Sequence, residues 1–169
     1  LYKESCAEDP DDVKMLDGVE FALYEGTDTE CENPVMTATS VNGVVTFKDL
    51  KIGTYLVKES KTIGDYIIDN TVYTAEVTEA NIDTYAVLNG VQDNTLINDL
   101  PRTDLKIEKV AEENNGIKLP NSVYGLYKEN ENGEEEFVAK ATTDSNGVLK
   151  FDGILIGTEY TIREIQAPD

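Results

Sequence analysis

Residues 42–47 read NGVVTF and residues 146–151 read NGVLKF, so one stretch occurs twice at a spacing of about 104 residues. In both copies an Asn-Gly pair precedes an apolar run, and this pair favours the tight turn of a β-hairpin. Further along, residues 52–55 (IGTY) recur as residues 156–160 (IGTEY), with one residue inserted. A repeat of this length predicts two copies of one domain.

The segments around the repeat have the pattern of short strands. Residues 19–24 (VEFALY) alternate between two faces, and they recur more loosely as residues 122–127 (SVYGLY). Such a period of two is typical of half-buried strands, and strands follow one another at roughly ten-residue spacing without helical periodicity. The sequence therefore predicts an all-β fold of two tandem immunoglobulin-like β-sandwiches.

The repeat also predicts the domain boundaries. We expect a first module over residues 1–99, a linker over residues 100–103 and a second module over residues 104–169 that ends before its repeat is complete. The linker contains Pro101, which ends a strand and leaves little slack, so we expect a stiff connection. We also expect the chain to be a piece of a longer protein.

Charge and composition reduce the number of possible functions and partners. The chain has 14 Lys and Arg against 34 Asp and Glu, a formal net charge of −20, and no His. This balance disfavours nucleic acid and anionic membrane surfaces as partners, because both are polyanions. No apolar run approaches the roughly 18 residues of a membrane span, so we expect no membrane insertion in this segment. Zinc sites of the Cys/His type and Cys-His catalysis have no candidate residues, and we expect no metal or cofactor.

Three polar residues fall on apolar faces when the strands are counted: Lys3, Glu59 and Asn98. Lys3 shares its face with Leu1, and Asn98 shares its face with Leu96. One such residue near a strand end is ordinarily a solvated edge residue. Three of them in one module favour a buried site instead, because a buried charge is costly unless it is neutralised or paired.

The three residue types together predict a self-made cross-link. Burial lowers the pKa of a lysine and raises that of a glutamate, which gives a nucleophilic amine and a carboxyl group that can move protons. We expect Lys3 to attack the carboxamide of Asn98, with Glu59 as proton shuttle and carbonyl polariser. The product is a Lys–Asn isopeptide bond and one ammonia. Because this happens once per molecule, the protein is not expected to be an enzyme.

The second copy repeats two of these three residues. Lys109 follows Leu105 and Ile107 on one strand face, and Glu164 follows Ile162 on another. We expect Lys109 and Glu164 to be a donor and a shuttle whose acceptor is missing from this sequence.

The two cysteines, Cys6 and Cys31, leave two possibilities open. An even cysteine count in an exported protein favours a disulfide. The alternative is a pair of free thiols, since spacing alone does not establish proximity.

Four motifs resemble one known family. They are residues 16–23 (LDGVEFAL), residues 53–59 (GTYLVKE) with GDY at 64–66, residues 160–168 (YTIREIQAP) and residues 97–101 (INDLP). These segments are similar to the Cna-B or SpaA-type domains of pilins and collagen adhesins on Gram-positive cells. The first copy departs from the family where SKTI at residues 60–63 stands in place of the usual Ala-Pro.

The resemblance implies a prealbumin-like sandwich and a structural role as a stalk or pilin shaft module. It implies an extracellular, cell-wall-anchored protein whose anchor is not in this sequence, with neighbouring modules or pilus subunits as partners. The alternative is an adhesin module that binds a host extracellular-matrix protein or glycan. That alternative predicts an exposed aromatic patch, for which Tyr66, Tyr73 and Tyr85 are candidates.

Overall fold

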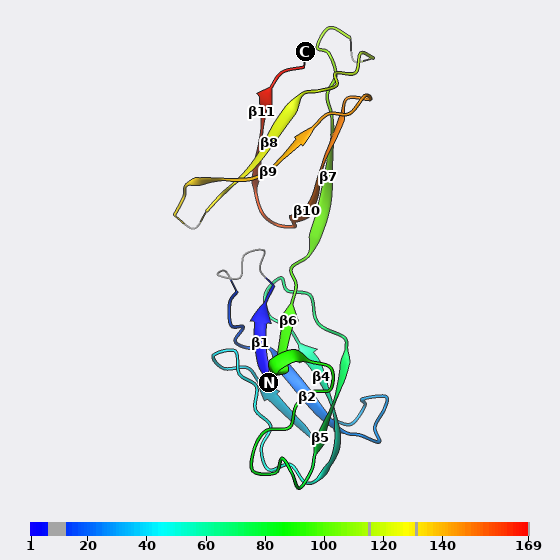
Figure 1. Ribbon diagram of the computed structural model, residues 1–169, viewed down its shortest axis with the longest axis vertical. Helices are drawn as coiled ribbons and strands as arrows, with labels where there is room; N and C mark the ends of the chain where they lie inside the picture. Colours follow the sequence, from blue (N-terminus) through cyan, green and yellow to red (C-terminus); the bar gives the residue numbers. More distant parts are fainter. Residues whose placement is uncertain (7–12, 115, 131, 169) are drawn as a thin grey trace. The chain divides into compact units, whose positions relative to one another are not determined.

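The computed structural model describes residues 1–6, 13–114, 116–130 and 132–168. Over these residues the chain forms strands β1 to β11 and one short 3₁₀ helix, η2 (Gln92–Asn94), as Figure 1 shows. No helix in these ranges is long and apolar enough to cross a bilayer. The all-β class predicted from the repeat is therefore confirmed.

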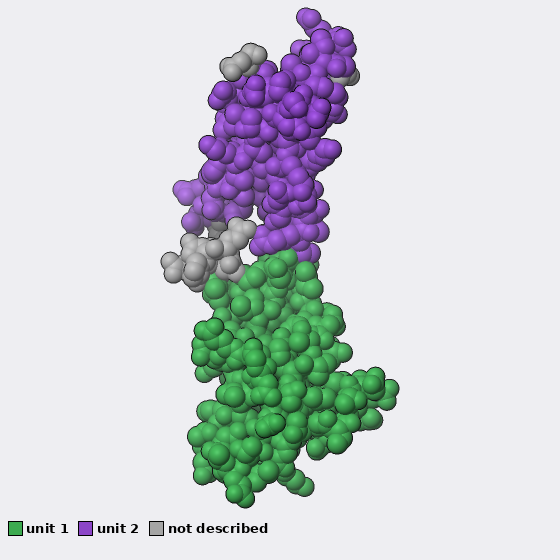
Figure 2. Space-filling model, turned by 45° about the vertical axis from the view of Figure 1, so that its right-hand side comes forward, with its two compact units in different colours: residues 1–100 green, residues 101–169 purple. Residues whose placement is uncertain are grey.

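The chain divides into two compact units, which Figure 2 colours separately: unit 1 (Leu1–Leu100) and unit 2 (Pro101–Asp169). Part of the expected linker, residues 100–103, lies in a strand. Its last two residues open strand β7 (Arg102–Glu108), where they pair with the end of β10 (Val148–Leu155). Their backbone groups are thus taken up by a strand ladder, which an unpaired linker would leave to water.

Unit 1 is built from two sheets. The larger is antiparallel with the strand order β3-β2-β4-β5, and the smaller is the parallel pair β1-β6. The strands are β1 (Tyr2–Ser5), β2 (Glu20–Glu25), β3 (Met36–Thr39), β4 (Gly53–Lys61), β5 (Val72–Val77) and β6 (Thr95–Asn98).

The turn predicted at Asn42-Gly43 is present in unit 1. Both residues have positive φ, 51° and 68°, and Val41 and Val44 bridge across them. Positive φ at both central positions is the geometry of a type I′ hairpin turn, which explains the Asn-Gly pair. A Cβ on Gly43 would lie 2.6 Å from the sulfur of Met15, so this position also needs glycine for close packing.

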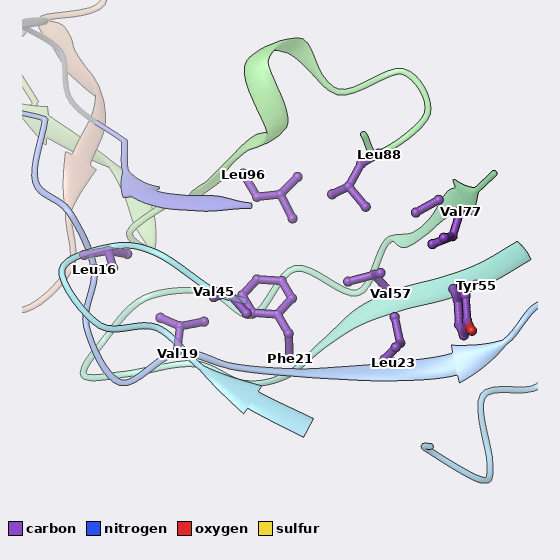
Figure 3. Packing of buried hydrophobic residues seen from close by; sticks show 11 residues of the cluster. Leu16, Val19, Phe21, Leu23, Val45, Tyr55, Val57, Val77, Leu88 and Leu96 are labelled. Atoms are coloured by element: carbon purple, nitrogen blue, oxygen red, sulfur yellow. The ribbon is translucent and has the colours of Figure 1, made fainter. Parts of the chain in front are cut away.

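The core of unit 1 lies between these two layers. Figure 3 shows Phe21 and Leu23 of β2 beside Val57 of β4, with Leu88 and Leu96 facing them. The fully or nearly fully buried members are Leu16, Val19, Phe21, Leu23, Val45, Tyr55, Val57, Ala75, Val77, Leu88 and Leu96. Strand β2 differs from simple alternation, because four consecutive residues from Phe21 to Tyr24 are buried.

Unit 2 also has two sheets, a β10-β7 pair and a three-stranded sheet with the order β11-β8-β9. The strands not yet given are β8 (Val123–Glu129), β9 (Glu135–Thr142) and β11 (Tyr160–Gln166). Its buried core is small and consists of Leu126, Leu149 and Phe151, with half-buried apolar residues packed around them.

The repeat relates the strands of the two units. By sequence, β7 corresponds to β1, β8 to β2, β9 to β3 and β11 to β4. In the described part of unit 2 no strand follows β11, so β5 and β6 of unit 1 have no counterpart there. This difference decides how the two candidate sites are enclosed.

Candidate functional site

Lys3, Glu59 and Asn98 meet in the core of unit 1. Lys3 Nζ donates a hydrogen bond to Asn98 Oδ1 at 2.6 Å and lies 3.4 Å from Glu59 Oε2. Asn98 Nδ2 donates to Glu59 Oε1 at 2.7 Å. The three residues are at most 1% exposed. Each therefore contacts the other two, and water is excluded from all of them.

The strand pattern explains why three polar side chains point inward. In β1, β4 and β6 the buried residues occur at every second position, and Lys3, Glu59 and Asn98 occupy these buried positions. The parallel β1-β6 pair places Ser5 opposite Asn98, and β2 places Phe21 opposite Glu59. Residues 95 positions apart thus come together through the pairing of the unit's first and last strands.

Burial sets the electrostatics of the site. Desolvation lowers the pKa of Lys3 below its ordinary value, although the carboxylate of Glu59 opposes this shift. The ammonium also lies 5.9 Å from the centre of the Phe21 ring. Among the described residues, Glu59 Oε2 has no hydrogen-bond partner, and it faces Lys3 Nζ. The amine is therefore easier to deprotonate than an exposed lysine, and an acceptor oxygen stands beside it.

The arrangement of these three groups can support amide formation. An amine nitrogen, a carboxamide and a carboxyl group lie within hydrogen-bonding reach of one another, which is the arrangement that nucleophilic attack with general acid–base assistance requires. Glu59 faces the attacking nitrogen with one oxygen and the nitrogen that would leave with the other.

Sequence reasoning missed three residues around this site. Thr62, half-buried and directly after β4, accepts a hydrogen bond from Asn98 Nδ2 at 2.9 Å. Asp69 accepts a hydrogen bond from the Tyr73 hydroxyl at 2.6 Å, and its charge favours the protonated form of Lys3. These residues come from loops and a neighbouring strand, where alternation does not predict which side chain reaches a site. The only available signal was that residues 60–63 depart from the family pattern.

In unit 2, Lys109 and Glu164 also meet. Lys109 Nζ donates to Glu164 Oε2 at 2.9 Å, but the two side chains are 29% and 30% exposed. The hydrogen bond to Glu164 raises the pKa of Lys109, which is the opposite of the direction at Lys3. Lys109 Nζ also lies 5.9 Å from the centre of the Tyr124 ring.

Cys6 and Cys31, for which the sequence left a disulfide or two thiols open, are not bonded to each other in the structure. Cys6 follows β1, and its Sγ donates to Asp99 Oδ1 at 2.9 Å. Cys31 lies beyond Glu25, the far end of β2, in the turn that leads to β3.

The three tyrosines considered for an exposed patch have different environments. Tyr66 and Tyr73 are half-buried, and both pack against the core of unit 1. Tyr85 is 84% exposed. It lines a cavity of about 790 Å³ in unit 1, whose walls include Leu23, Tyr55 and none of the three site residues.

Comparison with known families identifies the class of protein that this fold and site define. The model of the SpaA family, described as a prealbumin-like fold domain, matches residues 7–91 and 103–169. The chain belongs to this family, which confirms the resemblance read from the motifs. Curated proteins give no match.

Several solved structures are similar to this chain. The Bacillus anthracis TIE protein is 28% identical with a TM-score of 0.61, and the match covers 92% of this chain and 26% of that chain. The C-terminal fragment of the pilus adhesin SpaC from Lactobacillus rhamnosus GG is 19% identical with a TM-score of 0.47, covering 99% and 74%. A streptococcal ancillary pilin is 19% identical with a TM-score of 0.40, covering 99% and 52%. The chain thus spans about a quarter of the TIE protein and about half of the ancillary pilin.

Proposed function

We propose that this chain is a structural stalk or pilin shaft module of a Gram-positive surface protein, and that unit 1 cross-links itself through a Lys3–Asn98 isopeptide bond. The observation that carries the proposal is the buried contact of Lys3, Glu59 and Asn98. Membership of the SpaA family and the likeness to a pilus adhesin and a pilin support the extracellular, cell-wall setting.

The reaction is an aminolysis of a carboxamide. The neutral amine of Lys3 attacks Asn98 Cγ, forming the Nζ–Cγ bond, and gives one of its two protons to Glu59. Glu59 returns a proton to Asn98 Nδ2, the Cγ–Nδ2 bond breaks, and ammonia leaves. Glu59 ends in its starting protonation state, so each module makes one bond and turns over no external substrate.

The bond would change how unit 1 carries force. Lys3 lies in the first strand of the unit and Asn98 in the last, so tension between the ends of the unit would pass through the covalent link. The sheets between them would then be bypassed. By analogy with a disulfide that closes a loop of about 100 residues, the link would also remove roughly 4.7 kcal/mol of unfolded-state entropy.

Intact-protein mass tests this proposal. The wild-type chain is expected to weigh one ammonia less than its sequence, and Lys3→Ala, Glu59→Ala and Asn98→Ala are each expected to restore the full mass. Lys61→Ala is the matched control, because Lys61 is an exposed lysine in β4. A full sequence mass for the folded wild type would contradict the cross-link.

For unit 2 we propose that Lys109 and Glu164 are a donor and a shuttle. Their contact reproduces the Lys3–Glu59 pair, and the acceptor of unit 1 lies on β6, for which the described part of unit 2 has no counterpart. A chain extended by the following segment is expected to lose a second ammonia or a water, according to whether the acceptor is Asn or Asp. Lys109→Ala in that longer chain would abolish the second loss.

A second candidate function is that of an adhesin module that binds a host extracellular-matrix protein or glycan. The exposed Tyr85 beside the cavity of unit 1 favours it. A glycan or matrix-protein array giving saturable binding, lost in Tyr85→Ala and kept in Lys3→Ala, would support this function. If such arrays show no saturable binding, the adhesin function is contradicted and the structural role is the one that remains.

A further inference from the structure

Thr62 completes the hydrogen bonding of the acceptor carboxamide. Asn98 Nδ2 has two hydrogens; one is donated to Glu59 Oε1 at 2.7 Å and the other to Thr62 Oγ1 at 2.9 Å. The remaining polar atom of that side chain, Oδ1, accepts from Lys3 Nζ. Asn98 therefore has a partner for every polar atom of its side chain, and Thr62 holds the nitrogen that the reaction expels.

We propose that Thr62 is a positioning residue for the cross-link, a role that rests on the proposed function of unit 1. When Lys3 Nζ adds to Asn98 Cγ, the amide nitrogen becomes pyramidal and gains a lone pair. That lone pair takes up the proton that Glu59 carries. The hydrogen bond to Thr62 Oγ1 holds Nδ2 beside Glu59 Oε1, at 2.7 Å, while the nitrogen changes shape.

The bonds that form and break are balanced, and no proton moves to or from Thr62. The Nζ–Cγ bond forms, the Cγ–Nδ2 bond breaks, and one proton passes from Nζ through Glu59 to Nδ2. Ammonia leaves with three hydrogens, one of them still donated to Thr62 Oγ1. The hydroxyl thus acts as a fixed acceptor for the leaving group.

The second copy provides an internal contrast. Thr62 stands three residues after Glu59, and the residue three positions after Glu164 is Ala167. Alanine has no hydroxyl, so unit 2 cannot hold a carboxamide nitrogen in this way. The SKTI segment at residues 60–63, where the first copy leaves the family pattern, is therefore where unit 1 gains a contact of its own.

The test compares the rates of ammonia loss in wild type, Thr62→Val and Thr62→Ser. Intact mass is followed against time after cell-free synthesis at one fixed pH. Valine keeps the shape of threonine and removes the acceptor, so the bond is expected to form about ten- to a hundredfold more slowly. Serine restores the hydroxyl and is expected to restore most of the rate. Ser60→Ala is the matched control, because Ser60 bonds Glu20 on the surface.

Two further measurements separate positioning from folding. The unfolding of Thr62→Val is measured in a Lys3→Ala background, where no cross-link forms, and the folded fraction corrects the rate. The pH profile of the rate is expected to keep its midpoint while its plateau falls, because Lys3 and Glu59 are unchanged. If Thr62→Val does not fold, Thr62→Ala and Thr62→Ser provide the same comparison.

Each outcome decides the proposal. Equal corrected rates in wild type and Thr62→Val overturn the role of Thr62 and leave the cross-link intact. A serine variant as slow as the valine variant also overturns it, since the hydroxyl would then be irrelevant. A wild type that never loses ammonia overturns the proposed function of unit 1, and this inference with it.

Discussion

Units 1 and 2 bring the same pair of side chains together at different depths. Lys3 and Glu59 are completely buried, whereas Lys109 and Glu164 are each about a third exposed. Two strands account for the difference: unit 1 has β5 and β6, and the described part of unit 2 has no counterpart of either. A Lys–Glu pair on matching strands is thus not enough for a buried site, because the strands that enclose the pair come later in the chain.

Enclosure changes the chemistry of the amine. Desolvation lowers the pKa of Lys3, while the hydrogen bond that Lys109 donates to Glu164 raises the pKa of Lys109. Only the first direction favours the neutral amine that can attack a carbonyl carbon. The two units therefore contain the same Lys–Glu pair, but the pKa of the lysine is lowered in unit 1 and raised in unit 2.

Pulling on the ends of the chain is expected to show the largest difference between the units. With the bond in place, the roughly 95 residues between Lys3 and Asn98 stay hidden under force, and unit 2 alone extends. Asn98→Ala is expected to release roughly 300 Å of additional contour length. Single-molecule force spectroscopy measures this directly. Equal extension of wild type and Asn98→Ala would show that unit 1 has no covalent shortcut.

Removing the carboxylate is expected to affect the two units unequally. In an Asn98→Ala background, Glu59→Gln leaves the buried Lys3 ammonium without its partner and is expected to cost about 3–5 kcal/mol of unfolding free energy. Glu164→Gln breaks a partly exposed pair and is expected to cost at most about 1 kcal/mol. Urea unfolding measures both. Similar costs for the two substitutions would mean that burial does not distinguish the sites.

The two lysines are expected to titrate on opposite sides of the ordinary lysine value. Between the lowered pKa of Lys3 and 10.5, the unfolded state binds more protons than the folded state, so this group makes stability rise with pH. The stability that Lys109 contributes is present below 10.5 and is lost as pH rises through its raised pKa. NMR titration of the side-chain amines in Asn98→Ala tests the order, and Lys109 titrating first would contradict it.

The smallest effect is expected at the cysteines. Because Cys6 and Cys31 are not bonded, reducing agent is expected to leave the melting temperature of the protein unchanged. A disulfide would instead have contributed about 2–4 kcal/mol, which reduction would remove. Thermal melts with and without reductant, and a Cys31→Ser variant as control, make this comparison.

The sequence by itself determined the repeat, the strand class and the three inward-facing polar residues of unit 1. Strand periodicity assigns each residue to a face, so Lys3, Glu59 and Asn98 were found by counting from apolar neighbours. The Asn42-Gly43 turn was also readable, because a type I′ turn needs positive φ at both central residues. These are local properties of short segments.

The tertiary structure alone decided which residues meet and how deeply. The parallel pairing of β1 with β6 joins residues 95 positions apart, and no local pattern specifies that pairing. It also brought Thr62 Oγ1 within 2.9 Å of Asn98 Nδ2. Contacts of this kind depend on how whole strands and loops pack, and burial, which sets the pKa of a lysine, depends on every layer placed around it.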